Sequence, residues 1–382
     1  MKKSILRVIC ISMVAAFLTG CEKDNTPPPT MLSKTVPNLI QVNTVWSKST
    51  GSGSDQLYLS FGPAISQGII YTVDHSGRVY AANAQDGSKV WEVDVNMPIS
   101  SAPAAANGMV VFGTMDGHLI ALNAANGKML WTEILPSSLL SAPAIGNGVV
   151  VVHAHDGSVI AFNASTGQQK WLYNGSTPDL MLEAGTKPAI AGNSAVVGFA
   201  NGQLAAFNLQ NGVLEWLRPI ALPAGANAIE SMVDVGTPVI VNGVVYDDAF
   251  HGSVVAVNLA NGSLIWQHAL SAYMPITVVN GKVIVTSETG RVWALDQKTG
   301  AQDWVQDGLE YRFVTGPAAV GNTVAVGDYQ GYIHWLSLDN GQLEARTKID
   351  GSAIQAQPVI LNGQVIATSS GGELAVLQTS SK

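Results

Sequence analysis

Two histidines, His153 and His155, are spaced so that they could act together. Side chains two residues apart on a strand point to the same face, and Asp156 follows directly. Imidazole and carboxylate groups are ordinary metal ligands, so a surface metal site is imaginable here. The sequence offers no further ligand at a suitable spacing, and we therefore predict no metal site.

Asp247 and Asp248 form a second pair of ionisable groups, in the stretch YDDAFHG. The stretch ends an apolar run and leads into a hairpin turn, where aspartates are common, so we expect both carboxylates to be solvated. The chain shows no glycine-rich phosphate loop ahead of a helix and no Ser/His/Asp constellation in a pocket-forming context. We predict no catalytic residue, no cofactor and no enzymatic activity.

The N-terminus contains the one residue predicted to be modified, Cys21. Lys2, Lys3 and Arg7 precede an apolar run at 8–18, which is too short to span a membrane and is typical of a secretory signal. The run leads into Leu-Thr-Gly-Cys, which resembles the lipobox of bacterial lipoproteins. This resemblance implies cleavage before Cys21 and lipidation of its side chain. Ordinary signal cleavage near a chance cysteine is the alternative.

We therefore divide the chain into a signal peptide (1–20), a lipidated cysteine with a flexible proline-rich tether (21–40) and one folded domain (41–382). The only other cysteine, Cys10, lies in the signal, so the mature chain has no pair to form a disulfide. Loss of the three basic signal residues leaves 16 basic against 27 acidic side chains. This acidic balance disfavours nucleic acid and charge-driven binding to an anionic membrane.

A repeat of 38 to 50 residues fills the rest of the chain. Its landmark is a glycine that in six of seven cases is followed four residues later by a tryptophan. The glycines are Gly87, Gly127, Gly167, Gly212, Gly262, Gly300 and Gly341. The tryptophans are Trp91, Trp131, Trp171, Trp216, Trp266 and Trp304.

Each repeat is predicted to be a four-stranded antiparallel meander. In the unit at 101–133, short runs rich in Val, Ile and Leu are separated by Asn-Gly and Asp-Gly pairs, which favour tight hairpins. Eight prolines open such units, and radial stacking of sheets buries both their faces, so we predict an all-β, eight-bladed β-propeller. The last unit, from Pro358, supplies three strands, and we expect 41–46 to add the fourth and close the ring.

The repeated tryptophan is predicted to pack between blades. Six residues before the glycine, the first six units have alanine, so a large side chain on one strand meets a small one on its neighbour. In the seventh unit the sizes are exchanged, with Trp335 at the alanine position and Ala345 at the tryptophan position. We predict that Trp335 fills the space vacated at Ala345.

The alanine, glycine and tryptophan spacing resembles the repeat of the pyrroloquinoline-quinone-type propellers over nearly all of the chain after residue 40. One branch of that family, the quinoprotein dehydrogenases, would imply a redox enzyme. The other, the BamB lipoproteins of the outer-membrane β-barrel assembly machinery, would imply a non-catalytic scaffold. The adjacent cysteines often found in the dehydrogenases are missing from the mature chain.

Two long insertions break the repeat, after Trp171 and after Trp216. Because the chain reverses at every turn, both should emerge on the same face of the disc in adjacent blades, where they would form a docking surface. The alternative is that Leu180, Met181 and Leu182 fold under the rim as a small local core. The resemblance to BamB implies contacts with the barrel-forming subunit BamA from five residues: Leu180, Leu182, Glu183, Glu230 and Asp234. Glu183 replaces a basic residue of the family, which implies altered charge pairing.

The sequence therefore predicts a lipoprotein facing the periplasm from the outer membrane. As a scaffold it would bind the periplasmic domains of a BamA-like subunit, other members of the complex and unfolded outer-membrane protein clients. Two alternatives stay open: a quinone-dependent dehydrogenase, and a lipoprotein that binds small ligands or peptidoglycan at a central channel. Glu22 leaves retention in the inner membrane open as well.

Overall fold

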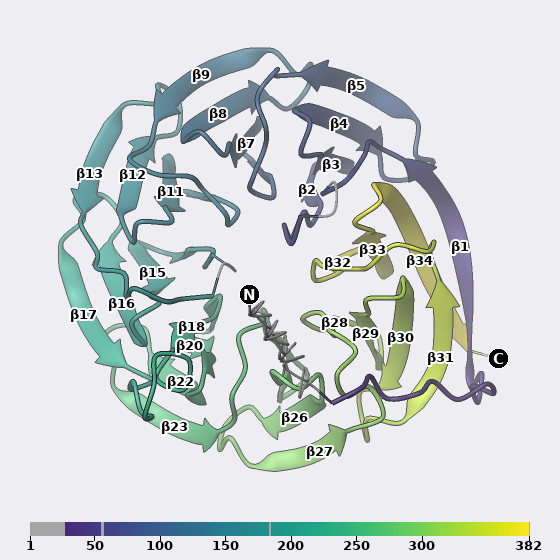
Figure 1. Ribbon diagram of the computed structural model, residues 1–382. Helices are drawn as coiled ribbons and strands as arrows, with labels where there is room; N and C mark the ends of the chain where they lie inside the picture. The colour runs from purple at the N-terminus through teal and green to yellow at the C-terminus, as the bar shows by residue number, and fades with distance from the viewer. Residues whose placement is uncertain (1–26, 55–56, 183–184, 382) are drawn as a thin grey trace, which may run out of the picture.

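A computed structural model describes residues 27–54, 57–182 and 185–381 as an eight-bladed β-propeller (Figure 1). Every regular element of the described residues is a strand, and the blades are four-stranded antiparallel sheets arranged in a ring. The predicted signal peptide and Cys21 lie outside the described residues, as does Glu183. No helix among the described residues has the length and apolar character needed to cross a membrane.

Blades 1 to 7 run from the inner strand to the outer strand in chain order. Blades 1 and 2 are β2 (Ala64–Ser66), β3 (Ile69–Val73), β4 (Arg78–Asn83), β5 (Lys89–Asp94) and β6 (Ala104–Ala106), β7 (Met109–Gly113), β8 (His118–Asn123), β9 (Met129–Ile134). Blades 3 and 4 are β10 (Ala144–Gly146), β11 (Val149–His153), β12 (Val159–Asn163), β13 (Gln169–Tyr173) and β14 (Ala189–Ala191), β15 (Ser194–Gly198), β16 (Gln203–Asn208), β17 (Leu214–Pro219).

Blade 5 has an additional pair of short strands at the end of its second and third strands. Blades 5 and 6 are β19 (Val239–Val241), β20 (Val244–Asp247), β22 (Ser253–Asn258), β23 (Leu264–Ala269) and β24 (Thr277–Val279), β25 (Lys282–Thr286), β26 (Val292–Asp296), β27 (Gln302–Gln306). Blade 7 is β28 (Ala318–Val320), β29 (Thr323–Gly327), β30 (Tyr332–Ser337), β31 (Leu343–Lys348). The extra pair is β18 (Asp234–Val235) with β21 (Ala249–Phe250).

Blade 8 closes the ring with strands from both ends of the chain. It consists of β32 (Val359–Leu361), β33 (Gln364–Thr368), β34 (Glu373–Ser381) and β1 (Ile40–Ser49). β1 pairs antiparallel with β34 along its length, from Ile40 opposite Ser381 to Ser49 opposite Glu373. The predicted closing strand at 41–46 lies within β1, and this pairing leaves neither end of the ring open.

The strands give the disc two rims that differ in their connections. We call one the turn rim, because it carries the first-to-second and third-to-fourth strand turns of each blade, joined for example by the hydrogen bond from Ala124 N to Gly108 O (2.9 Å). Asn107 and Gly108 have φ values of 52° and 78°, as a two-residue hairpin requires. The insertion rim carries the remaining turns and the blade-to-blade connections, as the bond from Leu135 N to Gly117 O (2.7 Å) shows.

Each repeated tryptophan packs on the turn of the next blade. Trp131 in blade 2 donates its indole N–H to Ala164 O in blade 3 (2.9 Å), and its ring covers Gly167. A Cβ on Gly167 would lie 3.0 Å from the indole, and its φ is 77°. The repeat glycine is therefore needed both for its backbone conformation and for the space it leaves.

Trp46 on β1 fills the same role for blade 1, since its indole N–H donates to Ala84 O (3.0 Å) and its ring covers Gly87. This explains why blade 7 lacks the tryptophan. Its outer strand faces blade 8, where the third and fourth strands come from opposite ends of the chain and no glycine turn joins them. Trp335 is fully buried, lies opposite Ala345 in the sheet and shares its core cluster, as the exchange of sizes predicts.

Candidate functional site

The two insertions lie side by side on the insertion rim. The first joins β13 to β14 at 174–188, and the second joins β17 to β19 at 220–238. The Thr186 hydroxyl donates to Val235 O (3.2 Å), and Lys187 N donates to the Thr237 hydroxyl (3.4 Å). The insertions therefore form one continuous surface across blades 3, 4 and 5.

The first insertion presents leucines at this surface. Leu180 is 42% exposed, whereas Met181 and Leu182 are half-buried. The second insertion adds Leu222 and Ile229, which are 70% and 69% exposed. Large apolar side chains exposed on the insertions of one rim are typical of an interaction surface.

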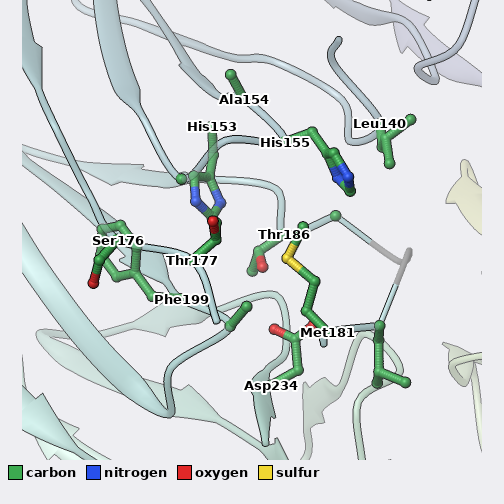
Figure 2. Close-up of a pocket in the computed structure, with 14 residues that line it drawn as sticks. Leu140, His153, Ala154, His155, Ser176, Thr177, Met181, Thr186, Phe199 and Asp234 are labelled. Carbon is green, nitrogen blue, oxygen red and sulfur yellow. The ribbon is translucent and has the colours of Figure 1, made fainter. Parts of the chain in front are cut away.

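A small pocket lies where the two insertions meet blades 3 and 4. Figure 2 shows His153 and His155 on one side and Asp234 across from them, with Met181 between. Phe199 from blade 4 completes the wall. The cavity volume of the pocket is about 30 Å³, enough for one or two water-sized groups. The pocket can accept the end of a partner's side chain but not a cofactor.

Asp234 lies inside this site and not on its surface. Its side chain is only 7% exposed, and β18 places it opposite Phe250. Burial raises the pKa of Asp234 to about 7, against a smaller lowering by hydrogen bonds from the backbone of Val235 and Leu182. A carboxyl group with this pKa changes its charge near neutral pH.

Asp247 and Asp248 are not the solvated turn residues that the sequence suggested. Both are completely buried at the end of β20, and β18 of the second insertion pairs with β21 directly after them. Asp248 N donates to Asp247 Oδ1 (2.9 Å), but Asp247 Oδ2 and both oxygens of Asp248 have no hydrogen-bond partner among the described residues. Burial raises the pKa of both carboxyl groups well above the usual value, and for Asp247 the neighbouring Asp248 and then Asp234 raise it further.

Glu230 is exposed on the second insertion, and its carboxylate is used within its own loop. It accepts hydrogen bonds from Ala226 N (2.8 Å) and from the Asn227 side chain (2.9 Å). Asn227 in turn accepts one from Glu230 N (2.9 Å). This reciprocal pairing fixes the shape of the loop that exposes Ile229.

The histidine pair lines the pocket without forming a metal centre. His153 Nε2 is buried with no hydrogen-bond partner in the part of the chain that the structure describes. Burial lowers the pKa of His153 to about 4, against smaller raising effects from the Thr186 backbone and from Asp156. Among the described residues no three His, Cys, Asp or Glu side chains are grouped to hold a metal ion.

Comparison with known proteins identifies the architecture. The family described as "Outer membrane protein assembly factor BamB" matches residues 41–134 and 110–306. An outer membrane protein assembly factor BamB from Kangiella koreensis is 36% identical over 97% of this chain and 96% of its own. The chain belongs to the BamB family.

A solved BamB structure agrees with this assignment. The crystal structure of BamB from Moraxella catarrhalis superposes with a TM-score of 0.81 and 26% identity, over 88% of this chain and all of that one. A quinohemoprotein alcohol dehydrogenase from Pseudomonas putida HK5 superposes with a TM-score of 0.69 but only 16% identity, over 92% and 78% of the two chains. The likeness to the dehydrogenase is therefore one of fold alone, and the close relatives are assembly factors.

Within this BamB-family chain, two features of the site were missed by the sequence analysis. One is the buried pair Asp247 and Asp248, and the other is Gly236, where a Cβ would lie 1.9 Å from Asp248 Oδ1. The sequence did offer one indication of these contacts. The second insertion directly precedes the first strand of blade 5, so it has to pack somewhere on that blade. In the structure the second insertion packs against the turn at the end of β20, through the pairing of β18 with β21.

Proposed function

We propose that this BamB-family protein is a non-catalytic scaffold of the outer-membrane β-barrel assembly complex, attached to the outer membrane by a lipid on Cys21 and facing the periplasm. It docks the periplasmic domains of a BamA-like barrel-forming subunit through the insertion rim. Other members of the complex and unfolded outer-membrane protein clients assemble around the pair. The observation that carries this proposal is the contact between the two insertions, which joins their exposed apolar residues into one surface.

The apolar residues supply most of the docking energy in this proposal. Hot spots at interfaces are large side chains near the centre of the contact, surrounded by groups that exclude water. Leu180 and Ile229 are the exposed anchors, one from each insertion. Leu182, which is half-buried, lines a small pocket together with Asp234.

The charged residues set the specificity of the contact. Asp234 lines the pocket between the two insertions, and it would bind a donor group at the end of a partner's side chain. Glu230 adds negative charge to the rim, and Glu183, which lies outside the described residues, is proposed to contribute to the same contact. The partner's matching surface is therefore neutral or basic.

A paired substitution tests the docking surface. Replacing Leu180 and Leu182 together by serine should weaken binding to the periplasmic domains of the barrel-forming subunit by at least about tenfold, because one exposed anchor and the half-buried leucine beside Asp234 are both lost. The matched control replaces Met129 and Leu130 by serine. These residues are 52% and 46% exposed on β9, away from the insertions, and binding should be unchanged.

Binding is measured by titration of the purified partner, with thermal unfolding as a check on the fold. Equal affinities for both double variants would refute the assignment of the insertion rim as the dock. A loss in the control variant alone would move the dock to the outer edge of blade 2.

A further inference from the structure

The segment before β1, residues 27–39, is bound to the outside of blades 6 and 7; we call it the strap. At its start, Thr30 N donates to Glu310 O (3.0 Å), and Arg312 Nη1 donates to Thr30 O (3.0 Å). At its end, Leu39 N donates to Glu344 O (2.8 Å). The strap is extended, as its prolines suggest, but both its ends are held by the disc.

The start of the strap is fixed to a buried ion pair. Arg312 is 2% exposed, and its Nε and Nη2 donate to Asp328 Oδ2 at 3.0 and 2.6 Å. His334, also completely buried, contacts the same oxygen through Nε2 at 3.0 Å. Charged groups with several hydrogen bonds in a dry interior hold one geometry, so the guanidinium is a rigid support for Thr30.

The strap has a defined direction across the disc. Glu310 and Arg312 belong to the connection between β27 and β28, which lies on the insertion rim. Glu344 follows the turn into β31, which lies on the turn rim. In between, Leu32 packs on the core cluster of blades 6 and 7, and Arg346 Nη2 donates to Ser33 O (3.0 Å). Figure 1 shows the strap in purple, passing outward to the start of β1.

This direction determines where a tether leaves the disc. Cys21 is nine residues before Thr30, and nine extended residues span about 30 Å at most. Strands of five or six residues with their turns make the disc roughly 25 Å thick. If the turn rim faced the bilayer, the tether would have to run from Thr30 on the insertion rim across the thickness of the disc, and this would use most of its length. If the insertion rim faces it, the whole length is free.

We infer that the strap turns the insertion rim toward the membrane that holds the lipid, with Thr30 no more than about 30 Å from the bilayer. This inference rests on the lipid anchor of the proposed function. The dock for the barrel-forming subunit then lies in the layer between disc and membrane. The turn rim faces away from the bilayer.

The orientation can be measured with single cysteine variants, because a lipidated Cys21 leaves the mature chain without a free thiol. Ala228→Cys places a fluorophore on the insertion rim, and Ala260→Cys places one on the turn rim of blade 5; both alanines are exposed. The full-length lipoprotein is purified, labelled and reconstituted into phosphatidylglycerol and phosphatidylethanolamine vesicles containing an acceptor-labelled lipid. Energy transfer should be at least about twofold stronger from the Ala228→Cys variant, given the thickness of the disc.

A strap-release variant provides the mechanistic control. Thr30→Pro removes the N–H that binds Glu310, and Leu32→Ser removes the apolar contact, while the blades keep all their own residues. In this background the two labels should give transfer efficiencies that approach each other, with an unchanged melting temperature of the disc. A difference that persists in full would mean that the strap does not orient the protein.

Flotation separates failure of this inference from failure of the proposed function. A lipoprotein that floats with the vesicles but shows equal or reversed transfer overturns the orientation and leaves the anchor standing. A protein that does not float overturns the lipid anchor, and the orientation with it. Binding of the barrel-forming subunit is scored separately, in detergent.

Discussion

The two rims of this disc are built from the same repeat but differ in their buried carboxyl groups. Among the described residues, one oxygen of Glu344 on the turn rim is buried without a partner. On the turn rim, glycines such as Gly108 and Gly243 have positive φ and open space around them, and the neighbouring backbone groups are hydrogen-bonded. On the insertion rim, three carboxylate oxygens of Asp247 and Asp248 are buried without partners among the described residues. Burial without partners disfavours the charged form of these carboxyl groups and raises their pKa values. The tryptophans of the turn rim pack one blade on the next, and the insertion rim is the surface that we propose for docking.

The largest effect on stability should come from removing one of the tryptophans that pack between blades on the turn rim. Trp131→Ala removes an indole that is 8% exposed and leaves a cavity against Gly167, so the free energy of unfolding should fall by about 3–5 kcal/mol. Affinity of the remaining folded protein for the barrel-forming subunit should be unchanged. Denaturant unfolding and binding titrations measure the two effects. A loss below about 1 kcal/mol would show that the packing of the tryptophans on the neighbouring blades does not stabilise the ring.

The next effect uses pH to compare carboxyl groups on the two rims. The pKa values of Asp247 and Asp248 are raised, so between the unfolded value near 4 and the folded value the native state holds protons that the unfolded state has released. Their stabilising effect is complete below about pH 4 and is lost as the pH rises through the folded values. Replacing both by asparagine should flatten the decline of stability with rising pH.

Asp86 on the turn rim should show the opposite sign. A hydrogen bond from the Ser88 hydroxyl, and then one from Ser88 N, lowers its pKa. Its contribution is present above the unfolded pKa and is lost as the pH falls through the folded one. Thermal unfolding of Asp86→Asn and of the double asparagine variant is followed from about pH 2 up to pH 8, because the contribution of Asp86 is lost only below the unfolded pKa of about 4. If both variants changed the pH profile in the same direction, the contrast between the rims would be wrong.

A smaller effect is expected from one alanine placed on each rim. Gly236→Ala would bring a Cβ within 1.9 Å of Asp248 Oδ1, and overpacking of this kind costs about 1–3 kcal/mol. Gly243→Ala meets nothing within 4 Å, so only its φ of 78° is strained, at about 1 kcal/mol. Asp248→Ala should rescue the first variant by removing the clash. Gly243→Asn should rescue the second position, because asparagine tolerates positive φ.

Much of the fold could be predicted from the sequence because its determinants are local. Asn-Gly turns, apolar runs of strand length and the glycine-to-tryptophan spacing each act over a few residues, and they gave the number of blades and the closure through β1. The place of both insertions on one rim follows from the alternation of strands. The burial of Trp335 opposite Ala345 could also be predicted, because the large and small side chains have exchanged places between two paired strands.

The chemistry of the site could not be predicted in the same way, because it depends on contacts between distant segments. Asp247 and Asp248 look like ordinary turn residues until β18, twelve or more positions earlier in the chain, pairs across them. Asp234 looks like a surface acid until Leu182 and Thr186 of the other insertion cover it. The strap is similar, since no local pattern shows that Thr30 reaches Arg312.

The most direct test of the account maps which rim touches the barrel-forming subunit in cells. A photo-crosslinking amino acid is placed at Leu180 or Ile229 on the insertion rim, and at Ala125 or Asn211 on the turn rim; all four positions are exposed. The account predicts adducts with the barrel-forming subunit from the two insertion-rim positions and none from the turn-rim positions. Adducts of equal yield from both rims, or from the turn rim alone, would contradict it.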